Sequence, residues 1–510
     1  METVHAVEFR GITKRFGDVI ANNNVNLYLD RGVVMSLLGE NGSGKTTLMN
    51  MLSGIYYPDE GQILIDGKPV TIRSPKDAYS YGIGMIHQHF KLVEVFTAAE
   101  NIVLGLETEG RLDRKQINRK VSEIASKYGF DIDPAKKIHD MSVSEKQTVE
   151  IIKVLYRGAD ILILDEPTAV LTPQETAKLF DVIRAMKADG KAIIIITHKL
   201  NEVKEISDVV AIMRKGEHIA TAHTNSVSET DMTEMMVGRK VELSIRREEP
   251  VNIKPRLTVA NLTCRNSEGI KKLSNVGFVA YGGEILGVAG IAGSGQKELL
   301  EAIAGLRRIE SGSIIYSPEG RTTMDLVGMS PTDIKDAGVA LAFVPEDRLG
   351  MGLVGSMGMT DNMLLRNWNA KKGLVIDKSE SKKMAESIFT ELEVVAPSID
   401  YPVRKLSGGN VQKVLVGREI ASSPSVFMSA YAVRGLDINT SYIIYELMAK
   451  QKDRGCAVIY VGEDLDVLLS LCDRIMVLCD GKVNAIVDAR VTTKEEIGLL
   501  MTSHDKKESQ

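Results

Sequence analysis

The 510-residue sequence lacks any apolar run long enough to cross a bilayer. Its longest apolar stretches, such as residues 192–196, have the length of buried strands. Basic residues are not in excess, because 63 lysines and arginines stand against 68 aspartates and glutamates, so no general field for nucleic acid is expected. The first residues lack the basic and apolar segments of a signal peptide. We therefore expect no direct membrane insertion and no nucleic-acid partner, and any membrane association must come through another protein.

Cysteine is also scarce, and the first half of the chain has none. The four cysteines show no C-x-x-C spacing, so they are expected to be buried or incidental thiols in a reducing cytosol: Cys264, Cys456, Cys472 and Cys479. The chain is too long for one hydrophobic core, which predicts two or more domains.

A glycine-rich loop is the most informative segment that is present. Residues 39–46 match the phosphate-binding template G-x-x-x-x-G-K-[ST] at every fixed position. Residues 290–297 repeat the glycines but have Gln296 where Lys45 stands and Lys297 where Thr46 stands. The chain therefore contains a complete phosphate loop and an altered copy.

The copy belongs to a tandem repeat of the whole half-chain. Later motifs recur 265 residues apart, as Asp208 and Asp473 do, while the glycine loops are 251 residues apart. A period this long indicates duplicated domains and not a solenoid. We predict a first domain at 1–243, a linker at 244–256, a second domain at 257–502 and a polar tail at 503–510. Strands alternate with helical segments in each half, which predicts an α/β fold with a mostly parallel sheet core.

The first loop predicts a nucleotide site. Its glycines allow backbone N–H groups to face phosphate oxygens, and the following helix begins with a partial positive charge. Lys45 is expected to reach the β- and γ-phosphates, and the Thr46 hydroxyl to ligate magnesium. The expected ATP-binding residues of this segment are Gly39, Glu40, Asn41, Gly42, Ser43, Gly44, Lys45, Thr46 and Thr47.

Four further positions follow apolar strands and complete a hydrolytic set. Asp165 is expected to hold magnesium directly or through water, and Glu166 to polarise an attacking water. His198, after the next strand, is expected near the γ-phosphate. Gln88 fits a glutamine that senses the γ-phosphate and magnesium.

Phe16 is a candidate for stacking on the nucleotide base, with core packing as the alternative.

These motifs, in this order, resemble the ATP-binding cassette (ABC) ATPases over nearly the whole chain. The segment Leu406-Ser407-Gly408-Gly409-Asn410 resembles the signature motif of that family, whereas residues 141–147 carry a weaker version with Glu145 in it. The resemblance implies two tandem P-loop domains, each with a helical subdomain. It also implies that each ATP lies between the phosphate loop of one domain and the signature of the other.

Applied to this sequence, that pairing predicts one competent composite site and one degenerate site. The competent site combines the first-domain residues above with Ser407, Gly408, Gly409 and Asn410. In the other site His198 is replaced by Glu463, Gln88 by Glu346, and the acidic pair by Ala430 and Tyr431.

Fusion of two such domains resembles the ATPase subunits of bacterial monosaccharide and nucleoside importers. Gln88-His89-Phe90 favours the nucleoside members, with sugar import as the alternative. The resemblance implies ATP and Mg²⁺ as cofactors, two transmembrane permease subunits and an extracytoplasmic substrate-binding lipoprotein as partners, and a peripheral location on the cytoplasmic face of the membrane. A soluble ribosome-associated ATPase is less favoured, because such proteins usually have a long charged linker between two intact cassettes.

Overall fold

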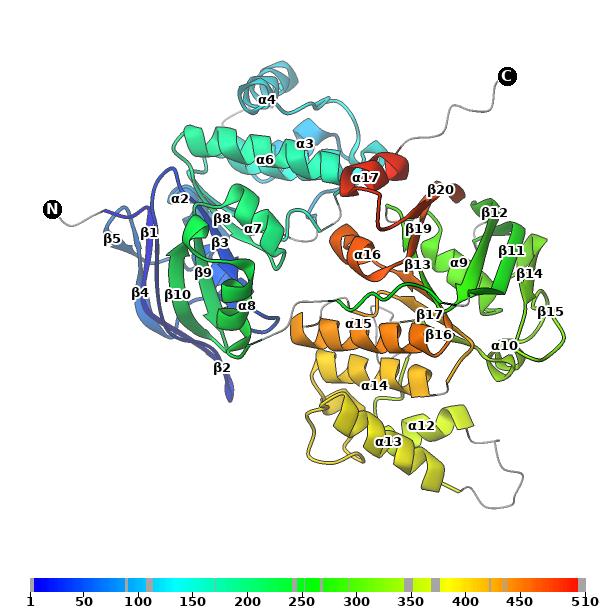
Figure 1. The fold of residues 1–510 in the computed structure, drawn as a ribbon. Helices are drawn as coiled ribbons and strands as arrows, with labels where there is room; N and C mark the ends of the chain where they lie inside the picture. The colour runs from blue at the N-terminus through cyan, green and yellow to red at the C-terminus, as the bar shows by residue number, and fades with distance from the viewer. Residues whose placement is uncertain are drawn as a thin grey trace. The chain divides into compact units, whose positions relative to one another are not determined.

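The computed structural model describes residues 4–502 apart from short gaps at 88–89, 107–112, 170, 241–244, 252, 267–268, 292, 344–351, 368–376, 422, 434–435 and 437. The chain forms two compact units, residues 1–242 and 243–510 (Figure 1).

The first unit contains two sheets, one antiparallel and one mostly parallel. The antiparallel sheet has the order β2-β1-β4-β5, and the six-stranded sheet has the order β10-β9-β3-β8-β7-β6. Among the described strands of the larger sheet, only β10 runs antiparallel. The strands are β1 (Val7–Phe16), β2 (Val19–Leu29), β3 (Val34–Leu38), β4 (Glu60–Ile65), β5 (Lys68–Val70), β6 (Ile83–Ile86), β7 (Ile161–Asp165), β8 (Ala192–Ile196), β9 (Val209–Arg214) and β10 (Glu217–His223).

Helices cover the parallel sheet, and three of them form a group with a core of its own. Buried residues of α3, α4 and α5 pack together in that group. The helices of the first unit are α1 (Lys45–Leu52), α2 (Pro75–Ser80), α3 (Ala98–Val103), α4 (Arg114–Tyr128), α5 (Val143–Tyr156), α6 (Pro173–Ala188), α7 (Leu200–Ile206) and α8 (Glu229–Val237).

The second unit repeats this topology strand for strand. Its sheets have the orders β12-β11-β14-β15 and β16-β17-β18-β13-β19-β20, and only β20 is antiparallel in the larger one. The strands are β11 (Lys254–Arg265), β12 (Lys271–Gly282), β13 (Glu284–Ala289), β14 (Ile309–Tyr316), β15 (Met324–Asp325), β16 (Val339–Phe343), β17 (Val426–Ala430), β18 (Ala457–Val461), β19 (Arg474–Cys479) and β20 (Lys482–Asp488).

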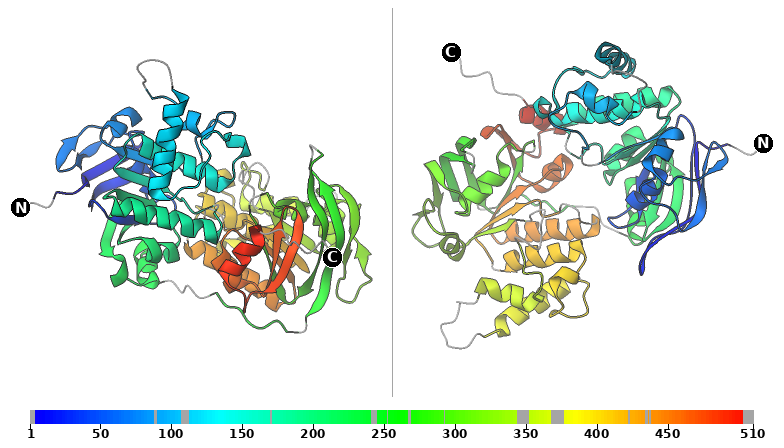
Figure 2. Two further views of the ribbon diagram at one scale, coloured as in Figure 1. Left: turned by 90° about the horizontal axis from the view of Figure 1, so that it is seen from above. Right: turned by 180° about the vertical axis from the view of Figure 1, so that it is seen from behind.

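The helices of the second unit follow the same plan. In the right view of Figure 2 the yellow helices α12 and α13 lie apart from the green strands β11 and β12. The helices are α9 (Gln296–Ile303), α10 (Pro331–Ala337), α12 (Met359–Asn367), α13 (Ser379–Glu391), α14 (Gly408–Ala421), α15 (Ile438–Asp453), α16 (Leu465–Leu471) and α17 (Lys494–Thr502).

The sequence explains the central strands and several helix starts. Strand β8 reads Ala-Ile-Ile-Ile-Ile and is buried at every position, as expected of a parallel strand covered on both faces. Thr172 caps α6 with a reciprocal Thr172–Glu175 capping box, and Pro173 opens the helix. The prediction of α/β units with mostly parallel sheets and helical subdomains is confirmed, while the antiparallel sheet in each unit was not predicted.

The segment predicted as a linker, 244–256, falls within the second unit, and part of it is bound there. Strand β11 already begins at Lys254. The Arg247 guanidinium donates hydrogen bonds to the carbonyl oxygens of Leu469 (2.7 Å) and Cys472 (2.9 Å).

Among the residues that the structure describes, no helix has the length and hydropathy of a membrane span. The four cysteines are free and buried, as expected.

Candidate nucleotide site

The phosphate loop of the first unit joins the carboxyl end of β3 to the first turn of α1. Gly44 caps α1 with φ 94°, a conformation that glycine adopts at little cost. A Cβ at this position would lie 2.3 Å from the carbonyl oxygen of Ala21. The glycine is therefore required both by the backbone turn and by the neighbouring strand. The first N–H groups of a helix such as α1 have no partner within the helix.

Lys45 folds back over this loop. Its ammonium group donates to the carbonyl oxygens of Gly39 (2.7 Å) and Glu40 (2.9 Å). Burial lowers the pKa of Lys45 to about 8, and the charges of Glu166, Asp165 and Glu40 act against that shift. A cation held this close to helix N–H groups provides a site for phosphate.

Two carboxylates stand opposite that lysine at the end of β7. Burial, followed by the charge of Glu166, raises the pKa of Asp165 to about 6, while Lys45 lowers it. Burial would also raise the pKa of Glu166, but the hydrogen bond and charge of His198, with Lys45 and Lys199, leave it below its ordinary value. Glu166 therefore stays ionised, as a general base requires.

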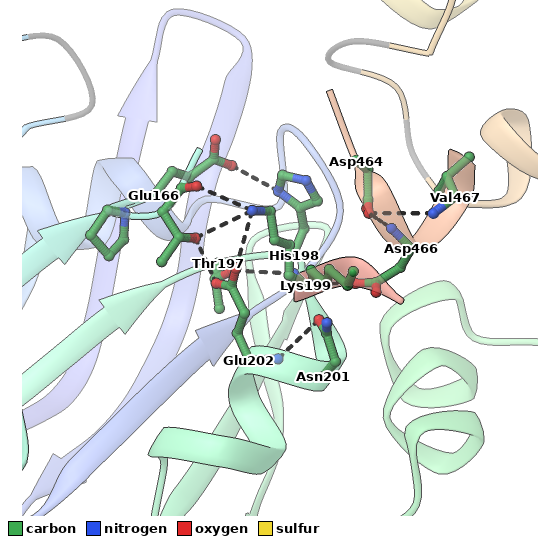
Figure 3. Close-up of polar contacts among 12 residues, drawn as sticks. Glu166, Thr197, His198, Lys199, Asn201, Glu202, Asp464, Asp466 and Val467 are labelled. Carbon is green, nitrogen blue, oxygen red and sulfur yellow. Dashed lines mark hydrogen bonds and ion pairs between the residues drawn. The ribbon is translucent and has the colours of Figure 1, made fainter. Parts of the chain in front are cut away.

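His198 follows β8 and contacts Glu166. Its Nδ1 lies 2.9 Å from Glu166 Oε1, and the imidazole is exposed (Figure 3). Glu166 has φ 46°, and its N–H donates to the carbonyl oxygen of Ile196 (2.9 Å). The structure therefore brings Lys45, Asp165, Glu166 and His198 together at the ends of the neighbouring strands β3, β7 and β8.

Phe16 ends β1, and its side chain is 42% exposed. The core-packing alternative is therefore wrong. Its ring meets Tyr56 edge to face at 5.1 Å, and the Lys14 ammonium lies 5.5 Å from the ring centroid. These contacts leave an exposed aromatic surface that suits stacking on a base.

Gln88 and Glu346 lie outside the described residues.

The two signature segments differ in how their helices begin. In the second unit Ser407 and Gly408 are exposed at the start of α14, and the Asn410 amide donates to Ser407 Oγ (2.9 Å). In the first unit Ser142 and Glu145 form a capping box, in which the Ser142 N–H donates to Glu145 Oε2 (2.7 Å). The carboxylate thus occupies the start of α5, where an anion would otherwise gain most from the helix dipole.

Three residues near Glu166 were missed when the sequence was considered alone. The ammonium of Lys199 lies 3.1 Å from Glu202 Oε1, and Thr168 Oγ donates to Glu202 Oε2 (2.6 Å). One signal was available in the repeat, because all three positions change in the second unit together with His198: the residues 265 positions later are Val433, Glu463, Asp464 and Val467.

The residues at this site suit Mg–ATP. A nucleoside triphosphate requires a glycine that lets the backbone approach closely and a cation at a helix start, and Gly44 and Lys45 supply them. A hard cation requires oxygen ligands, which the carboxylates of Asp165 and Glu166 supply at the end of β7.

Comparisons with known proteins agree with this arrangement. The profile of the family described as "ABC transporter" matches residues 22–169 and 273–429. The guanosine import ATP-binding protein NupO of Bacillus subtilis is 40% identical over 99% of both chains. The nucleoside import ATP-binding protein NupA of Lactococcus lactis is 40% identical over 98% of both chains. The glucose import ATP-binding protein TsgD13 of Haloferax volcanii is 39% identical over 97% of this chain and 95% of its own.

Proposed function

The chain belongs to the ABC transporter family as a tandem-cassette ATPase that binds ATP, and from that premise we propose that it powers the import of nucleosides. Each unit is one cassette. Two transmembrane permeases and an extracytoplasmic substrate-binding lipoprotein are the proposed partners, and the cytoplasmic face of the membrane is the proposed location. Identity of 40% to the guanosine and nucleoside import proteins, over nearly the full chain, supports this substrate class.

The observation that carries the hydrolytic function is the set formed by Lys45, Asp165, Glu166 and His198. In the proposed mechanism the loop N–H groups and Lys45 bind the β- and γ-phosphates, and Phe16 stacks on the base. Asp165 and Thr46, with Gln88, would hold magnesium, which would neutralise developing charge on the phosphates.

Glu166 acts as the base in this mechanism. Its carboxylate accepts a proton from water as the water oxygen bonds to the γ-phosphorus, and the bond from that phosphorus to the β–γ bridging oxygen breaks, which releases ADP. His198 keeps Glu166 oriented by the 2.9 Å contact and lies on the γ-phosphate side.

We further propose that the signature at Ser407, Gly408, Gly409 and Asn410 completes the same site on the γ-phosphate, as the family resemblance implies. The self-capped signature with Glu145 and the loop with Gln296 then form a degenerate site. Hydrolysis is thereby assigned to one site per chain.

Uptake of labelled nucleosides tests the substrate. Cells that make the chain with its permeases are expected to accumulate nucleosides. Cells that make the Glu166→Gln variant instead are expected not to accumulate them. A monosaccharide is the second candidate, supported by 39% identity to the glucose import protein. Uptake of ribose or glucose without nucleosides would replace the proposed substrate class.

A further inference from the structure

Two loops leave the adjacent parallel strands β7 and β8, and their residues are joined by contacts in both directions (Figure 3). The Glu166 side chain on the first loop reaches His198 on the second at 2.9 Å. In return the Lys199 ammonium on the second loop donates to the carbonyl oxygen of Thr168 on the first (3.2 Å). The residue after the histidine is therefore tied to the residue two positions after the glutamate.

A buried carboxylate completes this second tie. Glu202, in the first turn of α7, is 7% exposed, and Thr168 is 2% exposed. Glu202 pairs with Lys199 (3.1 Å) and accepts a hydrogen bond from the Thr168 hydroxyl (2.6 Å). A buried carboxylate needs such partners, since an unpaired charge in this position would be strongly unfavourable. We call Thr168, Lys199 and Glu202 the loop clamp.

The second cassette folds the same turn without the clamp. Tyr431 stands at the position of Glu166 with φ 56°, and its N–H donates to the carbonyl oxygen of Val461 (3.2 Å), as the N–H of Glu166 donates to Ile196 (2.9 Å). The backbone of the turn therefore does not depend on the clamp.

Helix capping does not explain Lys199 either. Asp464, its counterpart, caps α16 by accepting hydrogen bonds from the N–H groups of Asp466 (2.9 Å) and Val467 (3.4 Å) (Figure 3). Lys199 has nearly the same backbone conformation, with φ −88° and ψ 102° against −93° and 112°, yet its side chain forms no cap. A lysine at this position does not form the stabilising cap that an aspartate forms. We therefore attribute the role of Lys199 to its contacts with Thr168 and Glu202.

We propose that Thr168, Lys199 and Glu202 are positioning residues for hydrolysis, which keep His198 against Glu166 while phosphate groups bind and leave. This inference rests on the proposed ATPase function. Lys199 adjoins His198 in the chain, so its attachment to Thr168 limits how far the histidine loop moves from the glutamate. The clamp and the Glu166–His198 pair are absent together from the second cassette, which the proposed function leaves without hydrolysis.

The test uses steady-state hydrolysis of Mg–ATP by the full chain. Lys199→Ala is expected to lower kcat about 10- to 100-fold, the scale of a misplaced catalytic group, and to change KM for ATP less than twofold. Lys199→Arg, which restores a cation near Glu202, is expected to recover most of kcat. If Lys199 acts through His198, then Lys199→Ala adds little to the loss already caused by His198→Ala.

A triple variant shows whether a lower kcat results from loss of the clamp or from unfolding. The triple variant Thr168→Val, Lys199→Asp, Glu202→Val installs the residues of the second cassette, which form the same turn there. It is expected to keep ATP binding and a cooperative thermal transition but to show the reduced kcat. Asp464→Ala is the matched control: it removes a helix cap, lowers the Tm by about 2–4 °C, and leaves kcat unchanged.

Three results would overturn the clamp: an unchanged kcat in both Lys199→Ala and the triple variant, fully multiplicative losses with His198→Ala, or a rise in KM with kcat preserved. The same assay separates this failure from a failure of the proposed function. If the unmodified chain does not hydrolyse ATP, or if Glu166→Gln hydrolyses it normally, the proposed function itself fails.

Discussion

The two cassettes have similar phosphate-loop backbones and differ in the side chain at the position of Lys45, where the second cassette has Gln296. Gly44 and Gly295 start their helices with φ 94° and 103°. The N–H of Ser43 donates to Glu40 and that of Ser294 to Ile291, both at 3.1 Å. The geometry of the loop is therefore kept by glycines and local hydrogen bonds, and it does not require a catalytic lysine.

Gln296 shows the difference most simply. Its side-chain amide donates to the carbonyl oxygen of Ile291 (3.1 Å), the counterpart of the Glu40 oxygen that Lys45 contacts. A neutral amide reproduces the internal contact of the lysine without its charge. The second cassette therefore preserves the fold of the loop but lacks the cation that the proposed mechanism places at Lys45.

Exchanging these two residues gives the largest expected effect. Lys45→Gln should lower kcat for ATP at least about 100-fold, because it removes a cation from the transferring phosphate. Gln296→Lys should leave kcat within twofold, since the second cassette still lacks the glutamate and histidine. Both are measured as steady-state phosphate release, and equal losses in the two variants would break the proposed asymmetry.

The signature segments offer a smaller effect. Asn410→Glu should create at Ser407 the capping box that Ser142 and Glu145 form, and so neutralise the start of α14 internally. We expect kcat/KM for ATP to fall about 10-fold, which corresponds to roughly 1.4 kcal/mol. Glu145→Asn is the matched variant in the first cassette, and it should leave hydrolysis unchanged. A fall in the second variant alone would assign hydrolysis to the other signature.

Alkaline pH should lower the free energy of unfolding of the second cassette more than that of the first. Burial raises the pKa of Cys456 to about 12 and raises that of Cys472 further, whereas the first cassette contains no cysteine. Above about pH 9 the thiol of the unfolded chain loses its proton and the folded thiol keeps it. Above about pH 9 the free energy of unfolding of the second cassette therefore falls by about 1.4 kcal/mol per pH unit for each such thiol. Below about pH 9 the thiols are protonated in both states, and the stability is unchanged by their titration.

Calorimetric scans at pH 8 and pH 10 test this, with a thiol reagent to identify the transition that exposes cysteine. That transition should move to lower temperature more than the other. Equal shifts of both transitions between pH 8 and pH 10 would contradict the assignment of this effect to the buried thiols. The Cys456→Ala variant should show a smaller difference between the two shifts.

The order of motifs was enough to predict much of this molecule. The apolar strands that precede the acidic pair and His198, β7 and β8, are parallel, as the sequence indicated, and they lie side by side. Motif spacing also predicted the repeated topology, because a duplicated sequence has a duplicated pattern of strands.

Other features depend on contacts that spacing does not encode. The antiparallel sheet was missed because its strands, such as β1 and β4, pair across the whole phosphate loop and α1. The clamp was missed because Thr168 and Glu202 are distant in sequence and each is ordinary alone. The capping box at Ser142 could have been predicted from the pattern Ser-x-x-Glu. From the sequence we noted only that Glu145 adds a negative charge to this segment.

The central claim is that hydrolysis occurs at one site per chain, with Glu166 as the base. The most direct test is the steady-state ATPase rate of Glu166→Gln beside Tyr431→Phe, the matched change in the second cassette. The account predicts a fall of at least about 100-fold in the first variant and an unchanged rate in the second. A Glu166→Gln chain that hydrolyses ATP at the normal rate would contradict it.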